Sequence, residues 1–200
     1  MKKIAILLFD EVEVLDACGP FEVFSVANRV AERAGNAMPF EVALVGIDDA
    51  AVRARGGMRI GVDTTIDDPR PYDLVLVPGG VVDAVSADGR VLQWLQRLRP
   101  GAEVVASVCT GAFVLAAAGL LDERPVTTHW EDLESLRDRW PELVVHEGVR
   151  YIDHGDLATS AGISAGLDLA LHLVARWAGA DHALVTAGQM DYDWSGAEHP

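Results

Sequence analysis

The stretch Val104-Val105-Ala106-Ser107-Val108-Cys109-Thr110-Gly111-Ala112-Phe113 decides the fold of this chain. Its first five residues are apolar or small, as in a strand that is buried on both faces of a sheet. The residues that follow Cys109 are apolar or small nearly all round, which is typical of a buried helix. A strand that ends in a nucleophile and turns at once into a helix predicts a nucleophile elbow. The bend of an elbow requires small residues two before and two after the nucleophile, and Ser107 and Gly111 occupy these positions.

Apolar runs and helix-period segments alternate along the rest of the chain. Strands are expected at residues 4–9, 40–45, 73–77 and 103–108, short strands at 126–128, 149–153 and 157–159, and helices at 21–34, 89–98, 110–118, 163–178 and 181–190. Residues 52–66, with two glycines at their centre, are expected to form a small hairpin outside the main sheet. The alternation predicts an α/β fold, a doubly wound parallel sheet of the flavodoxin type with helices on both faces, in a single domain over residues 1–200. In the helix at 163–178, Asp168, His172 and Arg176 share one stripe, which we interpret as a solvated face.

The composition indicates a globular protein with an acidic surface. Half of the residues are hydrophobic and 24% are charged, and 16 basic against 31 acidic residues give a formal net charge of −15. Such a surface repels nucleic acid and anionic lipid, so we expect neither as a partner, and small neutral or cationic molecules instead. The apolar run near the N-terminus is too short for a secretory signal or a membrane span, and the chain has only two cysteines. We therefore expect a cytoplasmic protein with reduced thiols.

Cys109 is the candidate nucleophile. The elbow presents its side chain at the carboxyl edge of the sheet, where open α/β sheets bind their ligands. The following helix places the sulfur at a helix N-terminus, which stabilises thiolate over thiol, and so predicts a thiol that is reactive at neutral pH. The alternative is an ordinary buried core cysteine.

Two further segments are expected at the same edge. Gly79 and Gly80 follow a strand that is expected beside the elbow strand, and their N–H groups can form an oxyanion hole, although Pro78-Gly79-Gly80 can also be a simple turn. Asp16 lies in an apolar context after the first strand, where burial raises the pKa of a carboxyl group and lets it exchange a proton near neutral pH. A helix cap is the alternative role for Asp16.

Taken together, these segments resemble the ThiJ/PfpI superfamily, which has the class I glutamine amidotransferase-like fold. The resemblance covers nearly the whole chain, and its motifs are Leu15-Asp16 with Gly19-Pro20, Val77-Pro78-Gly79-Gly80, Ser107-Val108-Cys109-Thr110-Gly111-Ala112, Ala117-Ala118-Gly119-Leu120-Leu121, Thr127-Thr128-His129-Trp130 and Ala161-Gly162-Ile163-Ser164-Ala165-Gly166. Within the superfamily the chain is most similar to the isonitrile hydratase type and to the amidase-like domains of AraC-type regulators. Since 200 residues leave no room for a helix-turn-helix module after this domain, we expect none.

The resemblance implies a role for each site residue. Cys109 matches the nucleophile and Asp16 the acidic residue that faces it, which is Asp in the isonitrile hydratase type and Glu in many other members. Thr110 stands where protease and deglycase branches often have His, and its hydroxyl and N–H can contact the substrate. The implied activity is the cofactor-independent hydration of an isonitrile to an N-substituted formamide through a thioimidate on Cys109. The implied assembly is a homodimer.

Some residues and functions stay open. His129 follows a short strand and is interpreted as a structural histidine near the site rather than one that orients water. The other histidines show no metal-ligand spacing, so we predict no metal. Cys18 is interpreted as a buried thiol rather than a redox partner of Cys109. Two alternative functions are a non-catalytic ligand or redox sensor and a glyoxalase-like or deglycase-like enzyme, the latter disfavoured by Thr110 and Asp16.

Overall fold

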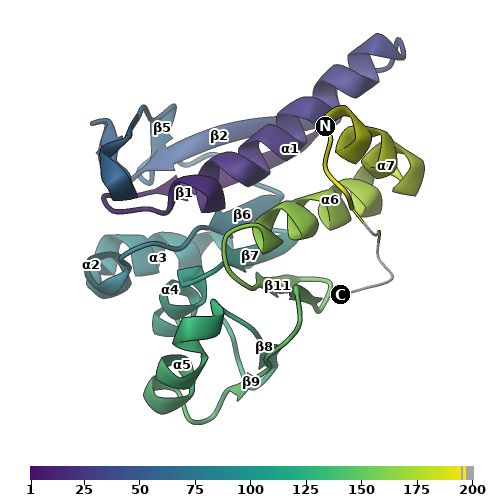
Figure 1. Cartoon of the computed structure of the whole chain (residues 1–200). Helices are drawn as coiled ribbons and strands as arrows, with labels where there is room; N and C mark the ends of the chain where they lie inside the picture. The colour runs from purple at the N-terminus through teal and green to yellow at the C-terminus, as the bar shows by residue number, and fades with distance from the viewer. Residues whose placement is uncertain (195, 197–200) are drawn as a thin grey trace.

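A central sheet organises the molecule. The computed structural model describes residues 1–194 and 196 (Figure 1). Among them the sheet has seven strands in the order β10-β11-β7-β6-β1-β2-β5, and only the pair β10–β11 is antiparallel. The strands are β1 (Lys2–Leu8), β2 (Phe40–Gly46), β5 (Thr64–Thr65), β6 (Leu74–Val77), β7 (Val104–Val108), β10 (Tyr151–Asp153) and β11 (Leu157–Ser160). The predicted parallel sheet is confirmed, with boundaries that differ by one or two residues in its central strands.

Helices cover both faces of this sheet. On one side α1 (Val14–Arg33), α6 (Ala165–Ala178) and α7 (Ala180–Gln189) pack against one another. On the other side lie α2 (Asp83–Ala87), α3 (Gly89–Leu98) and α4 (Gly111–Ala117). Right-handed crossovers require this arrangement, because the chain moves from β1 to β2 in one direction and from β6 to β7 in the other.

Shorter elements complete the structure. A small lobe below α4 in Figure 1 holds α5 (Leu133–Arg139) and the parallel pair β8 (Pro125–Val126) and β9 (Val144–Val145). A turn of 3-10 helix, η2 (Trp130–Asp132), precedes α5. The expected hairpin is present as β3 (Val52–Arg53) and β4 (Arg59–Ile60), joined by η1 (Arg55–Gly57), but β5 from the same segment joins the main sheet. The helices α2 and α5 are not predicted from the sequence.

The first helix begins seven residues earlier than predicted. The sequence predicts a helix that starts just after Pro20, yet Pro20 lies inside α1. Proline removes one helical hydrogen bond, here the one that residue 20 would donate to the carbonyl of Asp16. The buried face of α1, which includes Val23, Phe24 and Ala27, offsets that loss through packing. Asp16 consequently lies in the first turn of α1 and is not its N-cap, which is Glu13.

The stripe of α6 that was interpreted as solvated is instead held against β10. His172 Nε2 lies 2.8 Å from Asp153 Oδ2, and the His172 ring stacks on Tyr151 with centroids 4.9 Å apart. Asp168 is also buried, and its carboxylate accepts hydrogen bonds from Arg150. The helix period alone could not reveal this, because the strand that covers the stripe comes from another part of the chain.

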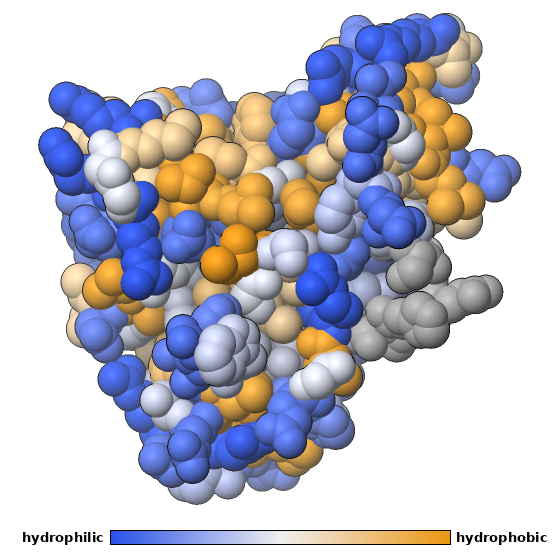
Figure 2. Space-filling view, viewed as in Figure 1, coloured by the Kyte–Doolittle hydropathy of each residue, from blue (hydrophilic) through white to orange (hydrophobic). Residues whose placement is uncertain are grey.

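The core consists of the sheet and the helix sides that face it. All residues of β6 and β7 are buried, as is α4 up to Ala116. Polar residues cover most of the face shown in Figure 2, and apolar side chains gather where the start of α1 lies beside the start of α6. In the described part of the chain no helix combines the length and the hydropathy that a membrane span needs.

Candidate active site

The elbow places Cys109 between β7 and α4 in a strained backbone conformation. Its φ is +57°, which is uncommon for any residue but glycine and is often found at functional sites. Hydrogen bonds hold this conformation: Cys109 N–H donates to the carbonyls of Ser160 (3.2 Å) and Ala161 (3.3 Å), and the Thr128 hydroxyl donates to the Cys109 carbonyl (2.8 Å). The end of β11 and the segment after β8 therefore fix the elbow.

The small residues of the elbow are needed for close approach. A Cβ atom on Gly111 would lie 2.1 Å from the Val77 carbonyl oxygen, at the end of the neighbouring strand β6. Ser107 is fully buried within β7. The predicted tight turn after Cys109 is confirmed, since no larger side chain fits at position 111 without moving the backbone.

Asp16 reaches the same point from the first turn of α1. Its side chain is fully buried, and Oδ2 accepts the N–H of Gly79 at 3.1 Å. Within the described residues Oδ1 has no hydrogen-bond partner. Burial raises the pKa of Asp16 to about 7, helped by the charge of Glu13 and opposed by the Gly79 N–H, the Cys109 thiol and the Ile163 N–H. The carboxyl group can thus take up or release a proton near neutral pH, as expected.

The ionisation of Cys109 differs from the expectation. Burial raises the pKa of the thiol to about 12, the negative charge of Asp16 raises it further, and the N–H groups of Thr110 and Ile163 only partly oppose this. The helix N-terminus does not outweigh desolvation because Cys109 is only 6% exposed. The resting site therefore holds a protonated thiol beside a titratable carboxyl group, and a thiolate forms when Asp16 or a substrate accepts the thiol proton.

The N–H groups of the two consecutive glycines are engaged within the protein. Gly79 N–H is bound to Asp16, and Gly80 N–H donates to Thr110 Oγ1 at 2.9 Å. The Thr110 hydroxyl in turn donates to the Gly80 carbonyl at 3.0 Å. Neither glycine tolerates a side chain: a Cβ on Gly79 would lie 2.6 Å from Thr110 Oγ1, and one on Gly80 would lie 2.2 Å from the Glu11 carbonyl. In this structure both glycines position Asp16 and Thr110.

The loop at the start of α6 also lines the site, and the sequence pattern alone predicts no role for it. Ile163 has φ +51°, a rare conformation for a β-branched residue, and its N–H lowers the pKa of both Asp16 and Cys109. The preceding Gly162 makes room for His129, because a Cβ there would lie 2.0 Å from the His129 ring. This loop follows β11, the neighbour of β7, so the edge rule that located Gly79 and Gly80 could have located it too.

His129 contributes to the wall of the site. Its Nδ1 accepts the N–H of Glu131 at 3.3 Å, which caps η2 and leaves Nε2 to carry the proton of the neutral ring. Cys18 is half-buried, and burial raises the pKa of its thiol. Both cysteines are free thiols. No group of three or more His, Cys, Asp or Glu side chains suited to a metal ion occurs in the part of the chain that the structure describes.

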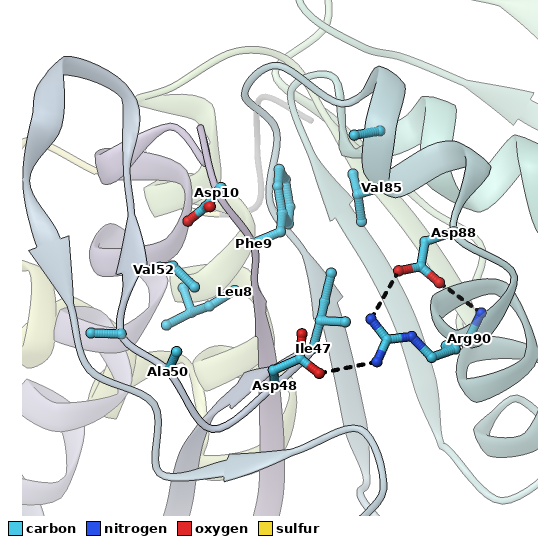
Figure 3. A pocket seen from close by; sticks show the side chains of 12 residues that line it. Leu8, Phe9, Asp10, Ile47, Asp48, Ala50, Val52, Val85, Asp88 and Arg90 are labelled. Atoms are coloured by element: carbon cyan, nitrogen blue, oxygen red, sulfur yellow. Dashed lines mark hydrogen bonds and ion pairs between the residues drawn. The ribbon is translucent and has the colours of Figure 1, made fainter.

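Two of the cavities at the carboxyl edge of the sheet differ in the residues that line them. One of about 270 Å³ reaches the nucleophile, and Cys109, Thr110, His129 and Ile163 are among its lining residues. The other, of about 280 Å³, lies at the ends of β1 and β2 and is shown in Figure 3. There Phe9 and Val85 form apolar walls and Arg90 is bound between Asp48 and Asp88, with no nucleophile among the lining residues.

Comparisons with known proteins show the family to which the chain belongs. The profile of the DJ-1/PfpI family matches residues 2–176. The chain is 34% identical over 192 residues to isonitrile hydratase of Pseudomonas putida, covering 95% of this chain and 78% of that protein. It is 31% identical over 183 residues to the HTH-type transcriptional regulator CdhR of Pseudomonas aeruginosa, covering 92% of this chain but about half (53%) of the regulator. A crystal structure of a ThiJ/PfpI family protein from Pseudomonas syringae superposes with a TM-score of 0.84 at 26% identity, covering 98% of this chain and 77% of that one.

Proposed function

We propose that this chain, which belongs to the DJ-1/PfpI family, is a cysteine-dependent enzyme that hydrates a small molecule, most specifically an isonitrile to an N-substituted formamide. The observation that carries the proposal is the pair of Cys109 and Asp16: a protonated thiol that lines an open cavity, next to a buried carboxyl group whose pKa is raised to about 7. The similarity to isonitrile hydratase of Pseudomonas putida supports the choice of substrate.

In the first step the thiol adds across the terminal carbon of the isonitrile. The Asp16 carboxylate accepts the thiol proton as the sulfur–carbon bond forms, and then delivers that proton to the same carbon. The product is a thioimidate, R–N=CH–S–Cys109, which contains every atom of the isonitrile and has no leaving group. A buried carboxyl group with a pKa near 7 suits both proton transfers, because accepting a proton and donating it differ little in free energy at neutral pH.

In the second step water hydrolyses the thioimidate. Asp16 accepts a proton from the water as its oxygen bonds to the imidate carbon, and passes that proton to the nitrogen. The carbon–sulfur bond of the tetrahedral adduct then breaks, Asp16 moves the proton of the adduct's hydroxyl group to the departing sulfur, and the formamide leaves. The N–H groups of Thr110 and Ile163 lower the pKa of the Cys109 thiol, so they stabilise the thiolate that departs. Gly79 and Gly80 serve by holding Asp16 and Thr110, and His129 shapes the wall.

The direct test incubates the purified protein with cyclohexyl isonitrile and follows the formamide by chromatography. We expect turnover in the natural protein and in Cys18→Ala, and none in Cys109→Ala. Absence of turnover with a panel of alkyl and aryl isonitriles, or turnover that survives in Cys109→Ala, contradicts the proposal. The Cys18→Ala variant is the matched control because Cys18 is the other free thiol.

A second candidate function is a sensor that retains the pocket without turnover. The similarity to the regulator CdhR favours it. A sensor of oxidants gives a sulfinic or related acid on Cys109 after mild peroxide treatment, with a change in thermal stability and no turnover of any isonitrile. A glyoxalase-like or deglycase-like enzyme would use the same thiol, and Thr110 and Asp16 still weigh against it.

The proposal includes a cytoplasmic homodimer. Sedimentation equilibrium at micromolar concentration measures the mass of the assembly directly. A mass of twice 21.4 kDa supports the dimer, and a mass of 21.4 kDa over the whole concentration range contradicts it.

A further inference from the structure

More acidic than basic side chains line the cavity that reaches Cys109. Its charged lining residues are Glu13, Glu131 and Asp132, with Arg55 as the cation. Arg55 lies 3.8 Å from Glu13, so this pair is close to neutral. Two carboxylates, those of Glu131 and Asp132, remain at the mouth.

The neighbouring histidine offsets at most one of these two carboxylates. His129 Nδ1 lies 3.4 Å from Asp132 and 3.8 Å from Glu131. A protonated ring carries one positive charge against two negative ones, so at least one carboxylate stays uncompensated. The mouth of the cavity is therefore negative, and it opens on a chain whose formal net charge is −15.

Two more observations show what kind of molecule the cavity suits. Val81 and Ile163 line it with side chains that are 48% and 39% exposed, so it offers apolar surface as well as charge. Asp16 is fully buried beside Cys109, its Oδ1 has no hydrogen-bond partner among the described residues, and its ionised form adds a third negative charge. A bound molecule thus meets the reacting thiol, apolar side chains and a surplus of negative charge.

We propose that this cavity selects its substrate by charge: it takes small molecules with a compact apolar body and a cationic or neutral outer end, and rejects anionic ones. Glu131 and Asp132 are the residues that determine this specificity. This inference rests on the proposed function only for the chemical group that reacts with Cys109, the isonitrile. Low-dielectric walls focus the field of such charges and change encounter rates by about tenfold or more.

The test measures how fast Cys109 reacts with three methanethiosulfonates that differ in charge, the 2-aminoethyl (cationic), propyl (neutral) and 2-sulfonatoethyl (anionic) reagents. In each case the Cys109 sulfur displaces methanesulfinate and forms a mixed disulfide, so the chemistry is constant across the series. Cys18→Ala serves as the background, which leaves a single reactive thiol. The ratio of cationic to anionic rates is divided by the same ratio for N-acetylcysteine amide.

We expect a normalised ratio of roughly 10 or more at low salt, falling toward 1 in 1 M KCl as the charges are screened. In the double variant Glu131→Gln/Asp132→Asn the ratio falls several-fold, whereas the control Glu32→Gln/Glu142→Gln, which removes two exposed carboxylates that do not line the cavity, leaves it unchanged. Asn keeps the capacity of position 132 to cap a helix. A variant that merely loosens the site speeds all three reagents alike and leaves the ratio unchanged.

A ratio near that of the free thiol, or one that the Glu131→Gln/Asp132→Asn variant does not lower, overturns the inference. This outcome is distinct from failure of the proposed function, because labelling needs no turnover. Once turnover is measured, ammonioalkyl, alkyl and carboxyalkyl isonitriles give the second readout. We expect kcat/KM to decrease in that order, and an equal or reversed order contradicts charge selection.

Discussion

At the scale of single residues, the pairing of the Cys109 thiol with the Asp16 carboxyl group matters most for the proposed reaction. Position in the sequence was enough to single out both residues, because the elbow and the end of the first strand are recognisable patterns. Their ionisation was only half predictable. Burial raises the pKa of both groups, but the degree of burial of Cys109 depends on β11 and the loop at Ile163, which lie far along the chain.

Asp16 also makes the stability of the protein depend on pH. Its folded pKa is about 7 and its unfolded value about 3.8, so the folded state binds the proton more tightly, and stability falls as pH rises between these values. The loss reaches up to about 4 kcal/mol for a shift from 3.8 to about 7. Asp16→Asn removes the charge, so we expect the variant to be more stable than the natural protein at pH 8 and about equal to it at pH 4.

Urea unfolding at pH 4 and pH 8 measures this difference. Glu32→Gln, at an exposed position, is the control and should change stability little at either pH. A difference between Asp16→Asn and the natural protein that is the same at both pH values would show that Asp16 is not protonated on folding.

Between elements, the elbow packs closely against β6. Gly111→Ala places a Cβ 2.1 Å from the Val77 carbonyl, so β7, α4 or β6 must move. We expect a loss of roughly 3 kcal/mol or more in unfolding free energy, together with loss of Cys109 reactivity. Gly89→Ala is the matched control, because nothing lies near a Cβ at the start of α3. Equal stability of the two variants would refute the constraint.

A second contact between elements joins α6 to β10. His172→Ala breaks the hydrogen bond to Asp153 and the stack on Tyr151, and we expect a cost of about 2 kcal/mol at pH 7. His146→Ala, on an exposed side chain, should cost less than about 0.5 kcal/mol. Thermal or urea unfolding measures the free energy of unfolding of both variants. Equally small losses in the two variants would mean that the α6 stripe is exposed to solvent, which contradicts the contact.

The limits of sequence reasoning are clearest for elements whose partners are distant. Strands and buried helices were predicted because their apolar pattern is local. The predicted start of α1 was wrong because Pro20 is a strong local signal for a helix boundary, which tertiary packing overrides. The interpretation of the α6 stripe as solvated was wrong because β10 covers that stripe. Both errors concern contacts that no local period encodes.

The whole molecule carries a large negative charge that opposes its own compact state. With a formal net charge of −15, self-repulsion should outweigh the exposed ion pairs, which individually contribute little. We expect the melting temperature to rise between 10 mM and 300 mM KCl at pH 7.5, because salt screens the repulsion. Differential scanning calorimetry checks this, and a fall in melting temperature would mean that ion pairs dominate.

For the whole molecule, the alternation of strands and helices predicted the parallel sheet. The order of its strands explains why the site lies at the carboxyl edge of that sheet. The carboxyl ends of β1, β6, β7 and β11 bring together segments that are far apart in sequence. The expectation of a single domain remains a prediction. The cavities and their charged walls could not be predicted, since they are formed by loops whose conformation is set by strain and by tertiary contacts.

The central claim is that Cys109 adds to the substrate with Asp16 as proton carrier. Rapid acid quenching during the first turnover with cyclohexyl isonitrile, followed by mass spectrometry of the intact protein and its peptides, tests it most directly. We predict an adduct heavier by the full mass of the isonitrile, located on Cys109, that decays as formamide appears. Formamide without an adduct, or an adduct on Cys18 alone, would contradict the account.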